Sequence, residues 1–384
     1  MNVLTIIGTR PEAVKMAPVL RALAARDGIT STIVSTGQHP DLLDEPLRFF
    51  GLKADLAFRL MEADGHPERL VARAVAALLP MLEQRRPDRV LVQGDTASAL
   101  AGARAAMLAG IPFGHVEAGL RTHQHLPWPE ESFRCEIDRI ADLLFAPTPL
   151  AAANLRDETL RGSIYVTGNS GIDALRHVLV RIEEDAELRS ACDALLPEPA
   201  SGLPLALATL HRRESIGAGA LELCAALLTL ANEEAAEIAM PLHPNPAVSV
   251  PVRAVLDGHP RIHLLPPLNY PAMVRLMQQA DWILTDSGGI QEEAPTLGKP
   301  VLVLRDATER PEAIALGLAS LVGLDRHGIV AAARKILAEP RPAALASPYG
   351  DGHAAERIVA GLLGEAFQPF AEEPQPALKM VVGA

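Results

Sequence analysis

Residues 2–15 read NVLTIIGTRPEAVK. The run from 2 to 7 is almost continuously apolar and β-branched, which is typical of a parallel strand buried on both faces. The pattern breaks at Gly8 and Thr9, and Pro11 suits the first turn of a helix. The stretch therefore predicts a strand followed directly by a helix, which is the repeating unit of an α/β sheet.

The same alternation continues along the chain of 384 residues. Further strands are predicted near 31–35, 89–93, 112–116, 143–146 and 164–167 and, after a Pro-, Ser- and Gly-rich linker at 196–204, near 204–209, 238–242, 261–265, 282–285 and 300–304. We expect an α/β protein with two Rossmann-like domains facing a cleft. The predicted N-terminal domain covers 1–171, the C-terminal domain 172–365 and a tail 366–384.

Composition narrows the class of protein. The formal charge of −12 argues against broad binding to nucleic acid or to an anionic membrane. Three widely spaced cysteines fit neither a disulfide framework nor a thiolate zinc site. The short apolar opening lacks a basic leader, and no run approaches the length of a membrane span. We therefore expect a cytoplasmic protein.

Polar residues that follow the predicted strands are the candidate ligand contacts, because ligands bind beyond the carboxyl ends of such strands. Arg10 and Lys15 lie near the start of the first helix, where two cations beside the positive end of the helix dipole suit a diphosphate. The alternative is that both are solvated surface charges.

Three carboxylates are candidates for acid/base chemistry. Asp95 and Glu117 each follow a strand, and the Pro-rich loop at 127–131 can carry Glu131 toward them. Crowding of the three would raise their pKa values, leaving some protonated as acids and others available as bases. The simpler alternative for Asp95 is that it caps a helix.

Two strand ends in the second half add polar residues. His211 and Arg212, followed by Arg213 and Glu214, suit a phosphate, with a surface Arg–Glu network as the alternative. His243 and Asn245 come after the next strand and are further binding candidates, although a polar turn is the favoured interpretation of these two residues taken alone.

The segment 282–313 reads WILTDSGGIQEEAPTLGKPVLVLRDATERPEA. Ser287, Gly288 and Gly289 open a predicted helix whose free N–H groups allow close approach of an anion. Glu293 is placed to accept hydrogen bonds from a ribose, and Arg310 adds positive charge. This combination predicts a nucleotide diphosphate site.

No metal or cofactor is expected. His123 and His125 have no further ligand at a recognisable spacing, so a zinc site is not predicted. The chain also lacks the Gly-x-Gly-x-x-Gly dinucleotide fingerprint, the Walker phosphate loop and a Gly-x-Ser-x-Gly nucleophile elbow.

The motifs GTRPEAVKMAP, QGDT, GHVEAGLRT, PWPEE, HRRES, TDSGGIQEEAPTLGKP and ERPEA stand in this order over residues 8–313. Together they closely resemble the non-hydrolysing UDP-N-acetylglucosamine (UDP-GlcNAc) 2-epimerases. The resemblance implies a glycosyltransferase-B-like fold, a homodimer, and interconversion of UDP-GlcNAc and UDP-N-acetylmannosamine (UDP-ManNAc) without NAD or metal. The expected partner is therefore a UDP-sugar.

The resemblance also implies roles for the candidate residues. C2 loses its proton as UDP leaves C1, giving 2-acetamidoglucal, and UDP adds back after reprotonation on the other face. Acid/base work falls to Asp95, Glu117 and Glu131, with His211 assisting near the diphosphate. Contacts to the departing UDP fall to the remaining candidates: Arg10, Lys15, Arg212, His243, Asn245, Ser287, Gly288, Gly289, Glu293 and Arg310.

Some positions depart from the family pattern. Pro40, Asp41 and Phe133 replace the usual Arg, long amide or acid, and Asn, in a neighbourhood that holds an activating second UDP-GlcNAc in many bacterial members. The departures argue against that activation, although Gln38 and His39 remain regulatory candidates. They leave open a related UDP-2-acetamido sugar. A hydrolysing 2-epimerase, a glycosyltransferase and a non-catalytic UDP-sugar sensor also remain open at the level of the sequence.

Overall fold

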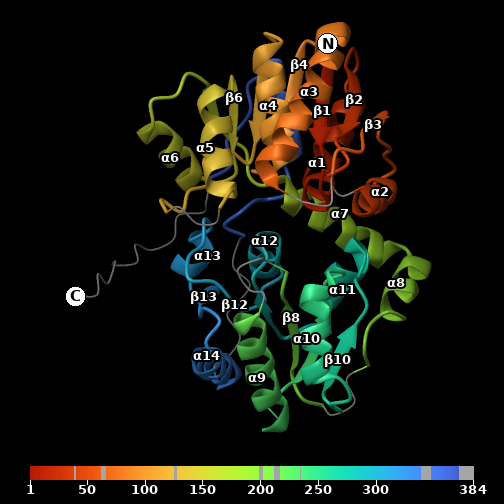
Figure 1. Cartoon of the computed structure of the whole chain (residues 1–384), viewed down its shortest axis with the longest axis vertical. Helices are drawn as coiled ribbons and strands as arrows, with labels where there is room; N and C mark the ends of the chain where they lie inside the picture. Colours follow the sequence, from red (N-terminus) through yellow and green to blue (C-terminus); the bar gives the residue numbers. More distant parts are fainter. Residues whose placement is uncertain are drawn as a thin grey trace. The chain divides into compact units, whose positions relative to one another are not determined.

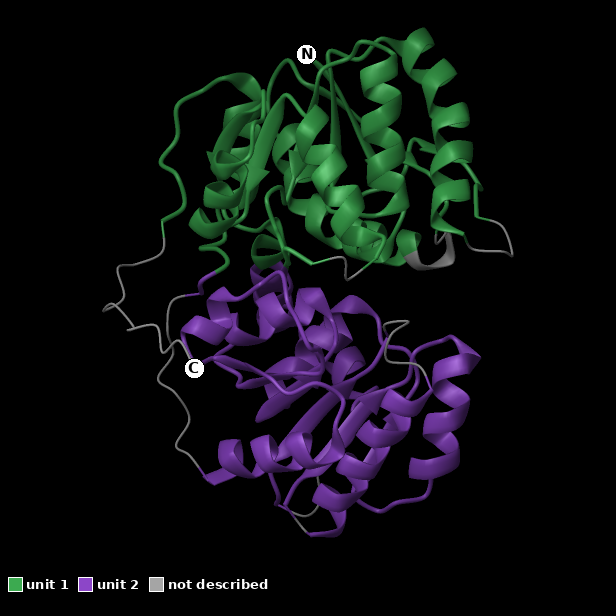
Figure 2. Ribbon diagram, turned by 60° about the vertical axis from the view of Figure 1, so that its left-hand side comes forward, with its two compact units in different colours: residues 1–174, 349–374 green, residues 175–348, 375–384 purple. Residues whose placement is uncertain are grey.

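The computed structural model describes residues 1–38, 40–61, 66–124, 128–198, 202–211, 217–233, 235–338 and 347–371. The chain divides into two compact units, coloured separately in Figure 2. Unit 1 comprises residues 1–174 and 349–374, and unit 2 comprises residues 175–348 and 375–384. In the described residues each unit is built on one parallel sheet with helices between its strands, so the predicted α/β class is confirmed.

Unit 1 has a sheet of seven strands in its described part, in the order β3-β2-β1-β4-β5-β6-β7. The chain reverses its winding between β1 and β4, which is the point of such a sheet where ligands usually bind. The strands are β1 (Asn2–Ile7), β2 (Thr30–Ser35), β3 (Leu56–Ala57), β4 (Arg89–Gln93), β5 (Phe113–Val116), β6 (Leu143–Ala146) and β7 (Ser163–Val166). The helices between them are α1 (Arg10–Ala24), α2 (Pro40–Phe49), α3 (Pro67–Arg85), α4 (Ala97–Leu108), α5 (Glu130–Ile140) and α6 (Pro149–Asp157) (Figure 1).

Successive side chains of β1 point to opposite faces of this sheet, and both faces are covered. Leu4 and Ile6 pack in one cluster with residues of α3 and α4. Val3 and Ile7 pack in another with Met16 of α1. This double burial explains why the strand is a continuous apolar run rather than an alternating one.

Unit 2 has a sheet of six strands in its described part, in the order β10-β9-β8-β11-β12-β13. The strands are β8 (Leu205–Thr209), β9 (Glu237–Pro241), β10 (Ile262–Leu265), β11 (Trp282–Thr285), β12 (Val301–Val303) and β13 (Ala319–Leu321). The helices are α8 (Ala186–Asp193), α9 (Ala218–Asn232), α10 (Pro246–Leu256), α11 (Tyr270–Gln279), α12 (Gly288–Thr296), α13 (Glu312–Ala315) and α14 (Arg326–Ala338). Here β8 and β11 are neighbours, so the segments after them lie side by side.

The end of the chain corrects the predicted domain limits. The division between the units falls inside α7 (Ser170–Glu184), and helix α15 (Ala354–Leu363) belongs to unit 1 rather than to the C-terminal domain. Ile358 and Leu362 pack in the same cluster as Met16, and the backbone N–H of Phe370 donates to the carbonyl of Val166 at 2.9 Å. Burial of this apolar helix face therefore draws the chain back onto the first sheet. Of the predicted tail, residues 372–384 lie outside the described residues.

The eleven predicted strands are all present to within a residue or so at their ends, whereas β3 and β13 were not predicted. Both are edge strands of three residues or fewer, too short for a readable pattern. None of the described helices is long and apolar enough to cross a bilayer.

Candidate active site

Glu117 follows β5 and is held from two sides. Lys15 of α1 donates through Nζ to both carboxylate oxygens at 2.7 and 2.8 Å, and the side-chain amide of Gln93, the last residue of β4, donates to Oε2. Glu117 and Lys15 are 6% and 8% exposed. The backbone of Glu117 has φ +70, a left-handed conformation that non-glycine residues adopt mostly where the surroundings enforce it. The carboxylate is therefore fixed before any ligand arrives.

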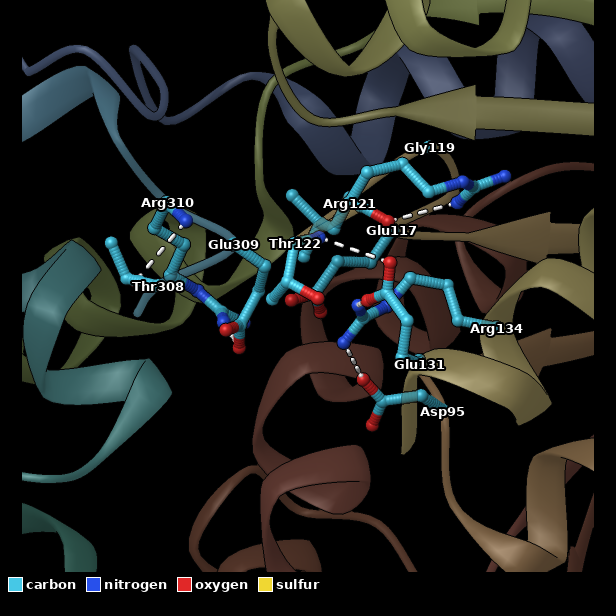
Figure 3. Close-up of polar contacts among 12 residues, drawn as sticks. Asp95, Glu117, Gly119, Arg121, Thr122, Glu131, Arg134, Thr308, Glu309 and Arg310 are labelled. Carbon is cyan, nitrogen blue, oxygen red and sulfur yellow. Dashed lines mark hydrogen bonds and ion pairs between the residues drawn. The ribbon is translucent and has the colours of Figure 1, made fainter. Parts of the chain in front are cut away.

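Asp95 and Glu131 share a single cation. The guanidinium of Arg134 donates through Nη2 to Asp95 and through Nη1 to Glu131, and Figure 3 shows it between the two carboxylates. Arg134 is 1% exposed, and it lies one turn after Glu131 on α5. The other oxygen of Glu131 accepts from the backbone N–H of Thr122 at 3.0 Å. The structure thus joins Asp95 and Glu131 through Arg134, whereas Glu117 is paired separately with Lys15.

The simpler interpretation of Asp95, that it caps α4, is wrong. The N-cap is Thr96, whose hydroxyl accepts from the backbone N–H of Ala99 at 3.0 Å. Asp95 is instead turned toward Arg134, with 26% of its side chain exposed. Its carboxylate is therefore available for chemistry.

Glu12 is a buried carboxyl that was not among the predicted site residues. It accepts from the backbone N–H groups of Gly8 and Thr9 at 3.0 and 2.7 Å, and from the Thr96 hydroxyl at 2.8 Å. Burial raises the pKa of Glu12 from 4.5 to about 7, against the hydrogen bonds that lower it. This residue ties the turn after β1 to the turn that carries Asp95.

The remaining candidates of unit 1 divide into described and undescribed positions. Arg10 begins α1 and is partly exposed. The amide oxygen of Gln38 accepts from the Ser98 hydroxyl at 2.8 Å, so this regulatory candidate contacts the start of α4. His39 lies outside the described residues.

In unit 2, His211 is bound by an acid at the end of the neighbouring strand. Its backbone N–H donates to both oxygens of Asp286 at 3.1 and 3.0 Å, and its ring Nδ1 lies 2.7 Å from Asp286 Oδ1. Asp286 is fully buried, whereas the His211 side chain is 39% exposed. Asp286 therefore orients the ring through Nδ1, and another part of the ring remains exposed. Arg212 lies outside the described residues.

The turn into α12 is shaped for close approach of a ligand. Ser287 is the N-cap, but its side chain makes no capping hydrogen bond, so capping does not account for the hydroxyl. Ser287, Gly288 and Gly289 are all partly exposed at the helix start. A side-chain carbon at Gly288 would lie 2.9 Å from Nη1 of Arg310, so the missing side chain leaves room for that guanidinium.

Arg310 is itself held by acids. Its Nε donates to Glu292 at 2.5 Å and its Nη1 to Glu309, as the left part of Figure 3 shows for Glu309. Glu309 also accepts from Arg305 at 3.0 Å. The network holds the guanidinium beside the start of α12.

Glu293 lies one turn inside α12 and is 8% exposed. The hydroxyl of Tyr270 donates to its Oε1 at 2.8 Å. Tyr270 was not among the predicted site residues. The available signal was a tyrosine, with its polar hydroxyl group, at the start of an apolar helix segment.

His243 and Asn245 form a polar turn. Asn245 is exposed and caps α10, where its side chain accepts from the backbone N–H of Ala247 at 3.0 Å. The part of the chain that the structure describes contains no cluster of His, Cys, Asp or Glu arranged to hold a metal.

Comparison with known proteins gives consistent matches over nearly the whole chain. A sequence model of the UDP-N-acetylglucosamine 2-epimerase family matches residues 21–363. The chain is 42% identical over 369 residues to the UDP-N-acetylglucosamine 2-epimerase of Yersinia pestis, which covers 94% of this chain and 98% of that protein. The crystal structure of UDP-GlcNAc 2-epimerase from Neisseria meningitidis bound to UDP-GlcNAc is 39% identical, with a TM-score of 0.90 and coverage of 95% and 100%.

A more distant structure, the glycosyltransferase of kitacinnamycin, is 15% identical, with a TM-score of 0.58 and coverage of 94% of this chain and 93% of that chain. This likeness concerns the fold alone. With the epimerase structure above, it confirms the predicted glycosyltransferase-B-like fold class.

Proposed function

The chain belongs to the UDP-N-acetylglucosamine 2-epimerase family and is therefore an isomerase, and we propose that it interconverts UDP-GlcNAc and UDP-ManNAc without hydrolysis. In this proposal a base removes the C2 proton while the C1–O bond to UDP breaks, giving 2-acetamidoglucal and UDP. UDP then forms a new bond to C1 as a proton is delivered to the opposite face of C2. No water is consumed, so substrate and product are isomers.

The observation that carries the proposal is that the three carboxylates of unit 1 are held in two separate places. Glu117 is bound by Lys15 and Gln93, whereas Asp95 and Glu131 share Arg134. Inversion at C2 needs proton transfer on two faces of one carbon. Carboxylates that are fixed independently in two places suit that requirement. We assign the acid/base work to these three residues.

The leaving UDP needs fixed positive charge and donors. We assign its diphosphate to the start of α12 with Ser287, Gly288 and Gly289, supported by Arg310, and its ribose to Glu293. His211 is assigned next to the diphosphate because its ring is oriented by Asp286 and open on its other side. Arg10 and, outside the described residues, Arg212 remain proposed UDP contacts.

Two assignments change with the geometry. Lys15 was predicted to stabilise the departing UDP, but its ammonium group contacts Glu117, so we assign to it first the holding of that carboxylate. Asn245 caps α10 and is exposed, which favours the polar-turn interpretation of His243 and Asn245 over a substrate contact. A homodimer in the cytoplasm remains part of the proposal.

The test is to incubate the protein with UDP-GlcNAc in deuterated water, without any second sugar, and to follow C2 and the anomeric proton by NMR. The expected result is deuterium at C2 together with UDP-ManNAc. Free N-acetylmannosamine and UDP would instead identify a hydrolysing enzyme. If no exchange occurs, the substrate assignment is wrong, and titration with UDP alone then separates a different UDP-sugar from a different ligand class.

The same reaction mixture tests activation by a second sugar nucleotide. Gln38 is bonded to Ser98, and Pro40, Asp41 and Phe133 depart from the family pattern. We therefore propose that turnover follows a simple hyperbolic dependence on UDP-GlcNAc. A sigmoidal dependence, or a reverse reaction that requires added UDP-GlcNAc, would contradict this.

A further inference from the structure

His115 lies on β5, two residues before Glu117, and is fully buried. Its Nδ1 is 2.6 Å from Oδ1 of Asp138, and its Nε2 is 2.8 Å from the backbone carbonyl oxygen of Gly94. Both ring nitrogens therefore face acceptors. A carbonyl oxygen only accepts, so Nε2 carries a hydrogen.

Asp138 is held in its ionised form by its neighbours. Burial alone would raise the pKa of this carboxyl, but His115 and Arg121 outweigh burial and hold the pKa below its ordinary value. Arg121 Nη1 lies 2.7 Å from Oδ2 of Asp138. Both partners of the carboxylate are 2% exposed or less, so bulk water does not replace these contacts.

The pair of His115 and Asp138 touches every element that carries a proposed acid/base residue. Through Gly94 it contacts the turn that continues into Asp95. Through Oδ2 of Asp138, which accepts from the N–H of Gly119 at 3.2 Å, it contacts the turn that follows Glu117. Asp138 itself lies on α5, the helix of Glu131.

The helix spacing adds to this connection. Glu131, Arg134 and Asp138 are separated by three and four residues, so they occupy one face of α5. One end of that face contacts Asp95 through Arg134, and the other contacts His115. The two contacts fix the rotation of α5 about its axis and its position along that axis relative to the ends of the strands.

We infer that His115 and Asp138 are positioning residues that set the relative placement of Asp95, Glu117 and Glu131, an inference that rests on the proposed epimerase function. A buried pair of this kind is a weak source of stability, because desolvation of its polar groups offsets their attraction. Its directional contacts to two turns and one helix fix geometry instead. Displacement of a reacting group by about 1 Å lowers a rate by roughly 100-fold.

The test compares two substitutions at His115, each of which keeps one of the two contacts that the ring makes. His115→Gln places an amide donor near the position of Nε2, which keeps the contact to Gly94 and loses that to Asp138. His115→Asn places its amide near the position of Nδ1, with the opposite result. Asp138→Asn removes the negative charge while it keeps the shape.

A matched control comes from unit 2. His263 on β10 lies 2.9 Å from Glu237 through Nε2; the His263 side chain is partly exposed, and neither residue is assigned a role in the proposed site. His263→Gln should leave kcat within about two-fold of the wild-type value. Any general effect of removing a histidine–carboxylate pair is thereby measured separately.

For each variant we would measure the UDP dissociation constant, KM and kcat for UDP-GlcNAc, and urea unfolding. The inference predicts a loss of about 100-fold in kcat for Asp138→Asn and for both His115 variants, with UDP affinity within about three-fold. A purely structural role predicts kcat that follows the folded fraction alone, and this result would overturn the inference. Loss of UDP binding in parallel with kcat would overturn it as well.

A second measurement does not depend on turnover or on the folding of a variant. In wild-type protein with 15N-labelled histidine, the His115 ring should show hydrogen on Nε2, because this nitrogen faces the carbonyl oxygen of Gly94 at 2.8 Å. A ring without hydrogen on Nε2 would refute the contact to Gly94 and with it the connection to the turn that continues into Asp95. If wild-type protein shows no epimerisation, the proposed function fails while this measurement still decides whether the contact to Gly94 is made.

Discussion

The ammonium nitrogen of Lys15 lies 2.7 Å from Oε1 and 2.8 Å from Oε2 of Glu117. One residue lies on the first helix and the other follows the fifth strand, 102 positions later in the chain. Because Gln93 contacts the same carboxylate, Glu117 is held in one orientation. The positive φ of Glu117 directs its side chain toward these partners.

Lys15→Met is expected to lower kcat by at least about 100-fold, because an unpaired buried carboxylate loses both its charge partner and its orientation. Steady-state kinetics with UDP-GlcNAc would measure the loss, at a temperature where urea unfolding shows the variant to be folded. Lys53→Met is the control, since Lys53 is exposed. Similar kcat values for the two variants would contradict the role of Lys15.

Arg134→Lys is expected to lower kcat by roughly 100-fold, although the charge is retained. The guanidinium contacts Asp95 and Glu131 through separate nitrogens, and an ammonium group lacks that planar fork. Arg104 provides a control on the other side of α5, where it binds the two oxygens of a single carboxylate, that of Glu136, at 2.6 and 2.7 Å. Arg104→Lys should retain kcat within about two-fold.

Glu12→Gln is expected to change how stability depends on pH. The folded-state pKa of Glu12 is raised from 4.5 to about 7, so the native state binds more protons than the unfolded chain between these values. The contribution of Glu12 is therefore fully present below pH 4.5 and is lost as the pH rises through about 7. Each pKa unit is worth about 1.4 kcal/mol, which makes the total about 3 kcal/mol.

Glutamine resembles the protonated acid, since it still accepts from Gly8 and Thr9 and donates toward Thr96. Urea unfolding of both proteins from pH 4.5 to 8 would measure the effect. The stability of Glu12→Gln relative to wild type should rise with pH across this window. Parallel stability curves would show that Glu12 does not titrate there.

Gly288→Ala and Gly289→Ala are expected to affect stability in opposite directions. A methyl group at Gly288 meets the guanidinium of Arg310, which Glu292 and Glu309 hold in place, so crowding should lower the free energy of unfolding by about 1–3 kcal/mol. A methyl group at Gly289 meets no atom within 4 Å and favours the helix, by up to about 1 kcal/mol. Thermal unfolding without ligand measures both; equal shifts would refute the crowding.

The sequence was sufficient for the strands with continuous apolar runs, because burial on both faces leaves a readable pattern. It could not show that α15 returns to unit 1: the apolar face of Ile358 and Leu362 indicates burial but not the partner. Short edge strands such as β13 depend on pairing rather than on their own residues. These features are decided by contacts between distant parts of the chain.

The site follows the same division. Asp95 and Glu117 were predictable because each follows a strand, and Glu131 because a Pro-rich loop can carry it toward them. Arg134 and Gln93, by contrast, acquire a role only through partners 39 and 24 positions away. The contact between Asp286 and His211 follows once the strand pairing is known. β8 and β11 are neighbours with Thr209 opposite Thr285, so Asp286, the residue after Thr285, lies close to His211. Strand order, which the sequence does not state, was the missing information.

Glu293→Ala is expected to weaken UDP binding by roughly 10- to 100-fold if Glu293 binds the ribose, since a hydrogen bond to a charged group contributes about 1.5–3 kcal/mol. The comparison ligand is 2′,3′-dideoxy-UDP, which lacks the hydroxyl groups in question. Wild-type protein should prefer UDP strongly over this ligand, and Glu293→Ala should bind the two almost equally. Tyr270→Phe, which removes the 2.8 Å bond to Glu293 but leaves the carboxylate, should show an intermediate preference. Calorimetric titration gives all six affinities, and a full preference for UDP in Glu293→Ala would place the ribose elsewhere.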